Sequence, residues 1–530
     1  MSSHAVSSTA SAKDAVSSND WSLFIASFLA LVAAGIGFSV RGAILGDWAA
    51  QYGFTQSELG TITGGGLTGF GLTIIVLSFF ADKIGYGPLM VLGFLLHLSS
   101  AIVTFFATSV FDQYGKDGAY TCLNIGMWLF ALGNGTCEAV INPLTATLFP
   151  KNKTHWLNIL HAGWPGGLIL GALLGLVFEN IGGVRWEIQL ATFLIPTLAY
   201  GALMLGKKFP KSEASVSGVE IGTMLAQFAA PVLLFLVFLH ALVGYVELGT
   251  DSWISNITGR ILESKSAGLW LFIWTSGLMF VLRFFAGPIV HKINPLGLLF
   301  ISAICGTIGL YLLGTTTTLA MCVIAATIYG LGKTFYWPTM LGVASERFPK
   351  GGALVLGIMG GVGMLSAGLL GGPIIGYKQD YFTTQKLEES NKAAYDRFKV
   401  EKPGAPYGFL PAIAGLDGSK VAILEDYEKN KDKPDAKLGY EKDLERVKGQ
   451  DQQKNKALLD DLTKLNDWWT KDEKPNAAAD LKDVVAARMT GGQKALLVTA
   501  LVPATMAIGY LLLILYFRAT GGYKQEHIGH

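Results

Sequence analysis

One acidic residue lies in the middle of a long apolar stretch of the chain. Apolar sequence runs from Cys122 to Phe149, and Glu138 stands near its centre, followed four residues later by Asn142-Pro143. A helix of this length could cross a bilayer, which takes about 20 residues. An ionisable side chain at that depth costs at least about 2.5 kcal/mol, so it normally faces a protein interior or water and has a function. Glu138 is therefore the first candidate for chemistry.

The chemistry open to such a carboxyl group is the binding and release of a proton. Burial penalises the charged form, so the group can bind a proton on one side of a membrane and release it on the other as its hydration changes. A proton that moves down the membrane potential yields about 2.3 kcal/mol per 100 mV, enough to bias the accumulation of a solute. Pro143, which lacks an N–H, would kink the helix beside the acid.

The composition of the whole chain agrees with a membrane location. The chain has 530 residues, 51% of them hydrophobic, and its mean hydropathy is positive. A formal net charge of +2 gives no reason to expect nucleic-acid binding. The four cysteines lie in apolar runs without metal-ligand spacing, so we expect no metal site. The sequence also lacks a convincing Ser/His/Asp arrangement or phosphate-binding loop, so we expect neither an enzyme nor a cofactor.

Twelve apolar segments are each long enough to form a membrane-spanning helix. They cover residues 21–45, 57–81, 88–109, 120–149, 156–179, 186–206, 224–248, 267–290, 296–314, 318–343, 353–377 and 493–517. Lysine and arginine concentrate in the short loops on the side of the polar linker at 207–222, which places that linker and both termini in the cytoplasm. The expected location is the cell membrane, and the inner one where a cell has two.

The segments divide into two six-helix halves and a large insertion. The N-terminal half covers 20–206, after a polar and disordered tail at 1–19 without the apolar core of a cleavable signal. The C-terminal half takes its first five helices from 223–377 and its last from 493–518, followed by a cytoplasmic tail at 519–530.

The insertion at 378–492 holds about half of the chain's charges. Its apolar residues recur at helical spacing: Leu444, Val447, Leu458, Leu462, Leu465 and Trp469. We therefore expect helices, on the extracytoplasmic side of the membrane. A solvated cap and a partner-binding module are the two interpretations.

The two halves repeat one another. In the fourth and tenth segments a proline, Pro143 or Pro338, is followed by a Phe-Pro-Lys triplet. Aligning the two prolines puts Lys333 opposite Glu138, each five residues ahead of its proline. Parallel six-helix halves with a site at their interface are expected of a secondary transporter. We predict that Lys333 is electrostatically coupled to Glu138, and a purely structural ion pair between them is the alternative to a proton-carrying role.

A loop motif follows the second segment of each half. The first copy reads Ser78-x-x-x-Asp82-Lys83-x-Gly85, and the second keeps Gly287 but has His291 in place of the acid. This motif resembles the loop signature of the major facilitator superfamily, Gly-x-x-x-Asp-Arg/Lys-x-Gly-Arg/Lys, with Ser78 in place of the first glycine. The resemblance implies an all-α membrane protein with 12 transmembrane helices in two six-helix bundles, here with a helical extracytoplasmic insertion. It also implies a conformational latch, in which an acid lies near a helix N-terminus, formed by Asp82, Lys83, Gly85 and Gly287.

Within that superfamily the chain is similar to the fucose/glucose-galactose–proton symporter group. The similarity lies in Glu138 with Asn142-Pro143, in Asp47 after the first segment, and in Gly244-Tyr245-Val246-Glu247 in the seventh. It implies proton coupling at Glu138 and Asp47. Two polar positions of the group in the fifth segment correspond here to His161 and Trp164. The expected substrate-binding residues are Asn142, His161, Trp164, Glu247, Lys333 and Trp337.

Several of these residues also have a simpler interpretation. Aromatic faces stack on pyranose rings, yet Trp164 and Trp337 could equally be interfacial or packing residues. Asp47 could be an ordinary loop acid, and Glu247 could mark a helix end. Arg41 would either extend to the membrane surface or bind a substrate oxygen. Arg283 would support the loop motif.

The leading hypothesis is a proton-coupled secondary active transporter of a small polar solute, with a sugar as the first class to test. It would work by alternating access, as a monomer in the lipid bilayer, with solute and protons as its partners. One alternative is an organic anion carrier, in which Arg41, Lys333 and Arg283 hold a carboxylate. The other is a non-transporting sensor or scaffold that acts through the insertion.

Overall fold

The computed structural model describes residues 17–52, 54, 56–401, 403, 406, 410–433, 437–449 and 456–528. These residues are mostly helical, and an isolated β-bridge joins Lys399 and Leu416. Eleven helices of this part are long and apolar enough to cross a membrane. The predicted all-α membrane fold is confirmed. Residues 1–16 of the expected tail lie outside the described residues, while Ser18 and Asn19 already belong to the first helix.

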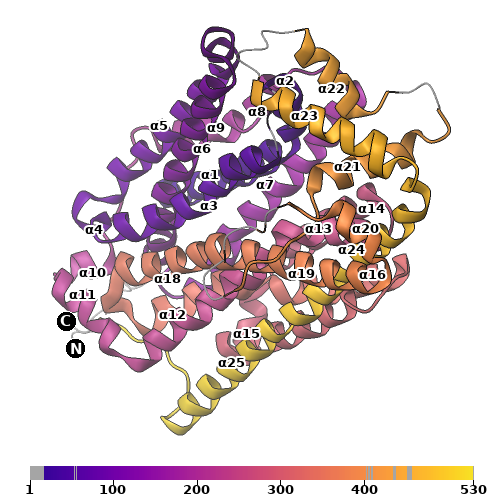
Figure 1. Ribbon diagram of the computed structural model, residues 1–530. Coiled ribbons are helices and arrows are strands. Elements are labelled where there is room, and N and C mark those ends of the chain that lie inside the picture. Colours follow the sequence, from indigo (N-terminus) through magenta and orange to yellow (C-terminus); the bar gives the residue numbers. More distant parts are fainter. Residues whose placement is uncertain are drawn as a thin grey trace, which may run out of the picture.

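The N-terminal half contains the first six crossings (Figure 1). They are α1 (Ser18–Ala43), α3 (Gln56–Ser78), α5 (Tyr86–Phe105), α6 (Ala107–Leu148), α7 (Lys153–Ile181), and α8 (Trp186–Ala191) continued by α9 (Leu194–Met204). Two short helices, α2 (Leu45–Tyr52) and α4 (Ala81–Ile84), lie in the loops between them.

Helix α6 is the crossing that hydropathy alone does not mark, because it is absent from the eleven apolar helices. A left-handed residue, Gly115 at φ +70°, separates its loop part from the part that packs against α3 and α5. The buried face of that second part carries Asn134, Glu138 and Asn142, which make the helix more polar than its neighbours. The least apolar crossing is thus the one that holds the candidate acid.

The C-terminal half contains the other six crossings. They are α12 (Pro231–Gly244) with η2 (Tyr245–Gly249) and α13 (Thr250–Ile261); α14 (Lys265–Arg283); α15 (Ala286–Leu313); α16 (Leu319–Lys333) with α17 (Tyr336–Arg347); α18 (Gly352–Ser366) with η4 (Ala367–Gly371) and α19 (Gly372–Ser390); and α24 (Ala477–Thr499) with α25 (Leu501–Ala519).

Two crossings of this half are interrupted by π-helical turns, η2 and η4, which lie against each other. A Cβ atom on Gly249 would lie 2.6 Å from the Cα of Gly371, so both turns depend on glycine for their close approach. A π turn widens a helix locally and often occurs at a functional site.

The loops of the two ends of the bundle differ. At one end, called here the terminal end, the linker helices α10 (Glu213–Val216) and α11 (Ile221–Ala226) lie beside Ile528, the last residue that the structure describes. Asn19 donates a hydrogen bond to the carbonyl oxygen of Lys208 there, at 2.9 Å. The two halves are in direct contact at this end, where Thr154 Oγ1 donates to Glu346 Oε1 at 2.6 Å.

The insertion lies at the opposite end, called here the insertion end (Figure 1). It contains α20 (Lys392–Phe398), α21 (Gly418–Asn430), α22 (Gly439–Lys448), α23 (Lys456–Trp468) and η5 (Trp469–Glu473). It has its own apolar core, in which Leu444, Val447, Leu462 and Trp469 are buried, as the helical spacing predicts. A cleft of about 1580 Å³ separates it from Gly46 and Phe54 of the N-terminal half.

The insertion continues two crossings without a break. Helix α19 runs from the eleventh crossing to Ser390, and α24 runs from Ala477 into the twelfth, and the two pack along each other. The boundaries expected at 378 and 492 therefore fall inside helices. The insertion is fixed to the C-terminal half by this pair, which forms its stalk.

A buried ionic cluster joins the insertion to its stalk. Arg397 of α20 donates to Glu473 Oε2 at 3.2 Å and to Asp480 Oδ2 at 2.9 Å. Glu473 has no exposed surface, and its Oε1 has no hydrogen-bond partner. Burial raises the pKa of Glu473 to about 8, and the neighbouring Asp480 acts in the same direction.

We predict that Glu473→Gln stabilises the protein at alkaline pH. The unfolded chain releases the Glu473 proton near its ordinary value of 4.5, whereas the folded chain retains it up to about pH 8. Because the folded state then binds more protons, the free energy of unfolding falls as pH rises between these values. The glutamine mimics the neutral acid and avoids this loss. In a thermal unfolding assay the variant should match the wild type at pH 4.5 and exceed it by about 2–4 °C at pH 8.5.

The exposed neighbour Asp472 supplies the control for this measurement. Asp472→Asn removes one carboxyl from the same turn without entering the cluster, so its thermal midpoint should follow that of the wild type at every pH. Parallel pH curves for Glu473→Gln and the wild type would show that Glu473 is ionised in the folded protein.

Candidate functional site

Glu138 is buried in α6 and has a single neutral partner. Asn142 Nδ2, one turn further along the helix, donates to Glu138 Oε2 at 2.6 Å. None of the ion pairs found among the described residues includes Glu138, although two buried pairs lie in the C-terminal half. An ionised carboxylate in this position would be desolvated without a compensating cation, which is costly. The site therefore favours a carboxyl group that carries a proton.

Asn142 connects Glu138 to the interface between the halves. His161 Nε2 of α7 lies 2.8 Å from Asn142 Oδ1, and it donates to that oxygen when it carries the ring proton. The carbonyl oxygen of His161 accepts a hydrogen bond from Arg283 Nη1 of α14 at 2.5 Å. The chain of contacts thus passes from the N-terminal half into the C-terminal half.

Arg283 is the residue that joins the two halves at this depth. Its Nη2 donates to Glu247 Oε1 at 3.0 Å, and its Nε donates to the carbonyl oxygen of Thr334 at 2.8 Å. Glu247 stands in the π turn η2, and its second oxygen accepts from the backbone N–H of Trp337 at 3.3 Å. Both charged side chains are buried, so each depends on the other for neutralisation.

The sequence did not reveal this role of Arg283. We expected it to support the loop motif, and that expectation is wrong, because its guanidinium group points to the centre of the bundle. The available signal was the presence of one acid and one base in apolar runs of neighbouring segments, Glu247 and Arg283. Charges in that environment pair with one another.

Lys333 pairs with Asp251 and not with Glu138, so the predicted coupling of Lys333 to Glu138 is wrong. Lys333 Nζ donates to both carboxylate oxygens of Asp251, at 2.6 and 2.7 Å. The repeat placed the backbone of Lys333 correctly, but its long side chain extends inside its own half to α13. Asp251 lies one helical turn after Glu247, so the C-terminal half contains two adjacent ion pairs.

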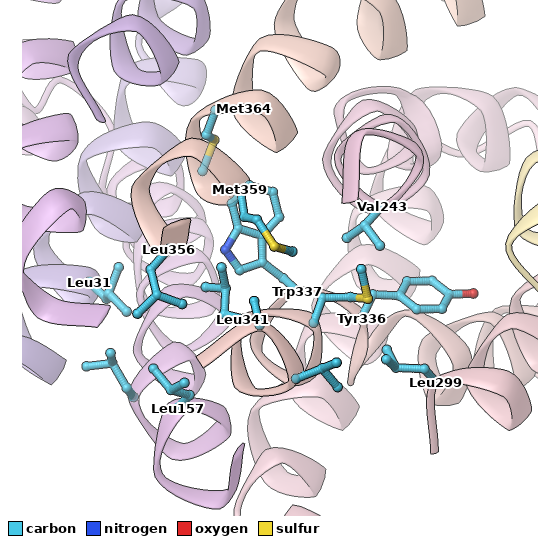
Figure 2. Packing of buried hydrophobic residues seen from close by; sticks show 14 of the residues in the cluster. Leu31, Leu157, Val243, Leu299, Tyr336, Trp337, Leu341, Leu356, Met359 and Met364 are labelled. Carbon is cyan, nitrogen blue, oxygen red and sulfur yellow. The ribbon is translucent and has the colours of Figure 1, made fainter. Parts of the chain in front are cut away.

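Trp337 lies in the apolar core between the halves, beside Met359 (Figure 2). Its ring centroid is 4.6 Å from that of His240 in α12. The indole Nε1 of Trp337 and both ring nitrogens of His240 are buried without a partner. His240 was not among the expected site residues, because a single histidine in an apolar run carries no signal in the sequence. Three unpaired nitrogens here could bind a polar ligand.

Two expected site residues lie away from this centre. Trp164, one turn after His161 in α7, packs its ring against Phe38 at 5.2 Å between centroids. Asp47 is exposed in α2 and accepts a hydrogen bond from Gln189 at 3.2 Å.

Arg41 fits neither interpretation that the sequence allowed. It is buried inside the N-terminal half, where its Nη2 donates to Ser100 Oγ at 2.9 Å and its guanidinium carbon lies 3.8 Å from the centre of the Phe130 ring.

The expected latch residues lie at the terminal end. Asp82 Oδ2 is buried beside Gly352, the first residue of α18 in the opposite half. A Cβ atom added to Gly352 would lie 3.0 Å from that oxygen. Gly85 has a φ of +91°, which favours glycine, and Lys83 is exposed. The backbone N–H of Gly287 donates to His155 Nδ1 of the N-terminal half at 3.0 Å. Asp82 therefore lies near the N-terminus of a helix in the other half, and its role in a latch stays a prediction.

Comparison with known proteins decides the family. A model of the Major Facilitator Superfamily matches residues 27–372. The chain belongs to the major facilitator superfamily. Members of this superfamily are transporters, and the chain shares their membrane-embedded fold. A search of curated protein sequences finds no match.

Three solved structures show the fold that this chain shares with known transporters. The fucose:proton symporter FucP of E. coli, in an outward conformation, is 15% identical with a TM-score of 0.55, over 68% of this chain and 91% of that one. A bacterial homologue of the human lysosomal transporter Spinster, facing inward, is 15% identical with a TM-score of 0.57, over 94% and 97%. The human organic anion transporter MFSD10 is 14% identical with a TM-score of 0.54, over 67% and 92%. Identities this low show the fold alone.

We predict that Asp251→Asn rescues the variant Lys333→Met. Lys333→Met leaves the Asp251 carboxylate, whose side chain is 12% exposed, without its cation, which costs less than the about 3–5 kcal/mol of a fully buried pair. Removing both charges should restore most of the thermal midpoint of the detergent-solubilised protein. Combining Lys333→Met with Glu138→Gln is the matched control and should restore nothing. Rescue by Glu138→Gln instead would bring back the pairing inferred from the repeat.

Proposed function

We propose that this superfamily member is a proton-coupled secondary active transporter of a small polar solute, with a sugar as the first class, and that it works by alternating access. The observation that supports this most directly is Glu138, a buried carboxyl group without a cation. It lies two hydrogen bonds from the interface of the halves, through Asn142 and His161.

The balance of buried charges supports Glu138 as the proton carrier. Glu247 and Asp251 each have a basic partner in the C-terminal half, so those two ion pairs are neutral as they stand. Glu138 becomes neutral only when it binds a proton. When Glu138 binds a proton, its carboxyl group can also donate a hydrogen bond. This changes the hydrogen bonds open to Asn142 and, through Asn142, those open to His161. His161 holds Arg283 through its carbonyl oxygen, so the change reaches the contact between the halves.

The same charge balance favours a neutral solute over an organic anion. An anion site would need free cations between the halves, but Arg283 and Lys333 are both paired with acids. Arg41 lies inside the N-terminal half against Phe130. The unpaired nitrogens of Trp337 and His240 can donate to or accept from hydroxyl groups, and the Trp337 face can stack on a sugar ring. FucP, a fold neighbour, is named as a fucose:proton symporter.

Within this proposal the other expected residues keep subsidiary roles. Asn142, His161, Glu247 and Trp337 line the solute path, and Lys333 holds Asp251 in place. Trp164 shapes the N-terminal wall of the path. A role for Asp47 in proton coupling stays a prediction, since its hydrogen bond with Gln189 lies at the exposed insertion end.

We predict that Glu138→Gln separates exchange from accumulation. The variant mimics the protonated acid, so it should still bind solute and exchange it in proteoliposome counterflow. It should not accumulate solute under an imposed pH gradient, because the driving proton has no site. The solute for both assays is chosen in a preceding thermal-unfolding screen of L-fucose, D-galactose, D-xylose, mannitol and lactate. It is the compound that raises the thermal midpoint of the protein most.

Asp47→Asn, measured in the same pair of assays, tests the predicted role of Asp47: the variant keeps both counterflow and driven uptake if Glu138 alone carries the proton, and loses driven uptake if Asp47 takes part. Full driven uptake by Glu138→Gln would move proton coupling to another group. Stabilisation by lactate alone would favour the organic anion alternative.

We further propose that the terminal end is cytoplasmic and the insertion extracytoplasmic, as the distribution of basic loop residues suggests. In a background without native cysteines, Lys464→Cys on the exposed face of α23 should react with an impermeant maleimide on intact cells, with any outer membrane permeabilised. Lys350→Cys, exposed at the terminal end, should react only after lysis. The reverse pattern would invert the topology.

A further inference from the structure

The segment after α25, Thr520–Ile528, is called here the strap. Two glycines turn it back toward the bundle: Gly521 has a φ of +100° and Gly522 a φ of +93°. The N–H of Gly522 donates to the carbonyl oxygen of Phe517 at 2.7 Å and so closes the end of the helix. Other residues adopt this backbone conformation only at a cost. The sequence therefore directs the strap along the terminal end.

The strap binds the end of α17 in the C-terminal half. Tyr523 donates its hydroxyl proton to Glu346 Oε2 at 2.7 Å. Arg347 forms an ion pair with Glu526 at 2.6 Å and donates to the carbonyl oxygen of Lys524 at 2.6 Å. The N–H of Glu526 donates to the carbonyl oxygen of Glu346 at 2.8 Å. Both the backbone and the side chains of the strap are thus held.

The strap also reaches the N-terminal half. Gln525 Nε2 donates to the carbonyl oxygen of Pro150, in the loop between α6 and α7, at 2.9 Å. Glu346, which accepts from Tyr523 with one oxygen, accepts from Thr154 of α7 with the other, at 2.6 Å. One carboxylate therefore binds the strap and both halves at once.

The far end of the strap packs against the linker helices and α18. Ile528 packs against Ala214 and Met224 of the linker helices and against Leu354 of α18. The strap consequently crosses from the last helix of the C-terminal half, over the junction of the halves, to the linker that connects them.

We propose that the strap is a conformational clamp, which binds a composite surface of the two halves and thereby stabilises the state closed at the terminal end. Its contacts with Glu346 and Arg347 lie within one half and persist when the halves separate. The bond from Gln525 to Pro150 joins different halves and must break, as must the bond from Thr154 to Glu346. Only such differential contacts shift a conformational equilibrium. The clamp goes beyond the proposed transport activity and does not depend on the proton or the solute.

Distances between spin labels test the clamp directly in the detergent-solubilised full chain, without native cysteines. Labels at Asn152→Cys and Lys350→Cys report the terminal end, because both positions are exposed and belong to different halves. Labels at Asp112→Cys and Ser266→Cys report the insertion end. Deleting residues 523–530 should raise the ratio of open to closed terminal-end distances about three- to tenfold, as expected for the loss of the hydrogen bond from Gln525 to Pro150, which exists only in the closed state. The insertion-end distances should shorten in step.

Single substitutions separate the clamp from general packing. Gln525→Ala removes the contact with Pro150 from a part-exposed side chain and should shift the ratio in the same direction as the deletion. Lys524→Ala is the matched control, because the strap is held there through the Lys524 carbonyl oxygen, and it should leave the ratio unchanged. Unchanged distances in the deletion variant would overturn the proposal. So would broadening at the terminal end without the reciprocal change at the insertion end.

Discussion

The need to neutralise charge away from water determines how the centre of this protein is built. The ionisable groups buried near the centre include five acids and strong bases, and four of these form two ion pairs, Arg283 with Glu247 and Lys333 with Asp251. A buried pair contributes little net stability, but its loss leaves an unpaired charge at high cost. The pairs therefore fix the relative positions of α13, α14, η2 and α16. The fifth group, Glu138, has no such partner, and its side-chain hydrogen bond comes from the neutral amide of Asn142.

The backbone around these pairs is shaped to bring them together. The π turn η2 displaces Glu247 from a regular helical position to a place where it reaches both Arg283 and the N–H of Trp337. The close approach of η2 and η4 is possible because Gly249 and Gly371 meet without side chains. Thus the π turn η2, which its glycine allows to pack closely, places the charged Glu247 inside the bundle. The hydrophobic pattern alone would not predict a charge at that position.

The sequence predicted the fold well, because long apolar segments and a repeated loop motif are properties of the chain itself. It identified even α6, which carries Glu138 in an otherwise apolar run and is too polar to be found by hydropathy alone. It failed where the direction of a side chain decides the contact. The repeat placed the backbones of Glu138 and Lys333 at equivalent depths, but Lys333 extends to Asp251. The predicted limits of the insertion, 378 and 492, fall inside helices for a related reason. Hydropathy changes where a helix leaves the membrane, whereas α19 and α24 continue beyond that point.

The chemistry of the contacts between the halves suits a repeated opening and closing. Where α3 crosses α18, glycines let the backbones approach, and a Cβ atom on Gly71 would lie 2.9 Å from the carbonyl oxygen of Gly361. Surfaces of this kind can slide without moving bulky side chains. At the terminal end the halves are joined instead by hydrogen bonds, from Thr154 to Glu346 and from Asn158 to Thr339. Water can replace each of these bonds when the halves separate, so each contributes only about 0.5–1.5 kcal/mol to the closed state. The hydrogen bonds at the terminal end thus make the closed state specific. Because each bond is weak and α3 crosses α18 through glycines, the halves can still separate readily.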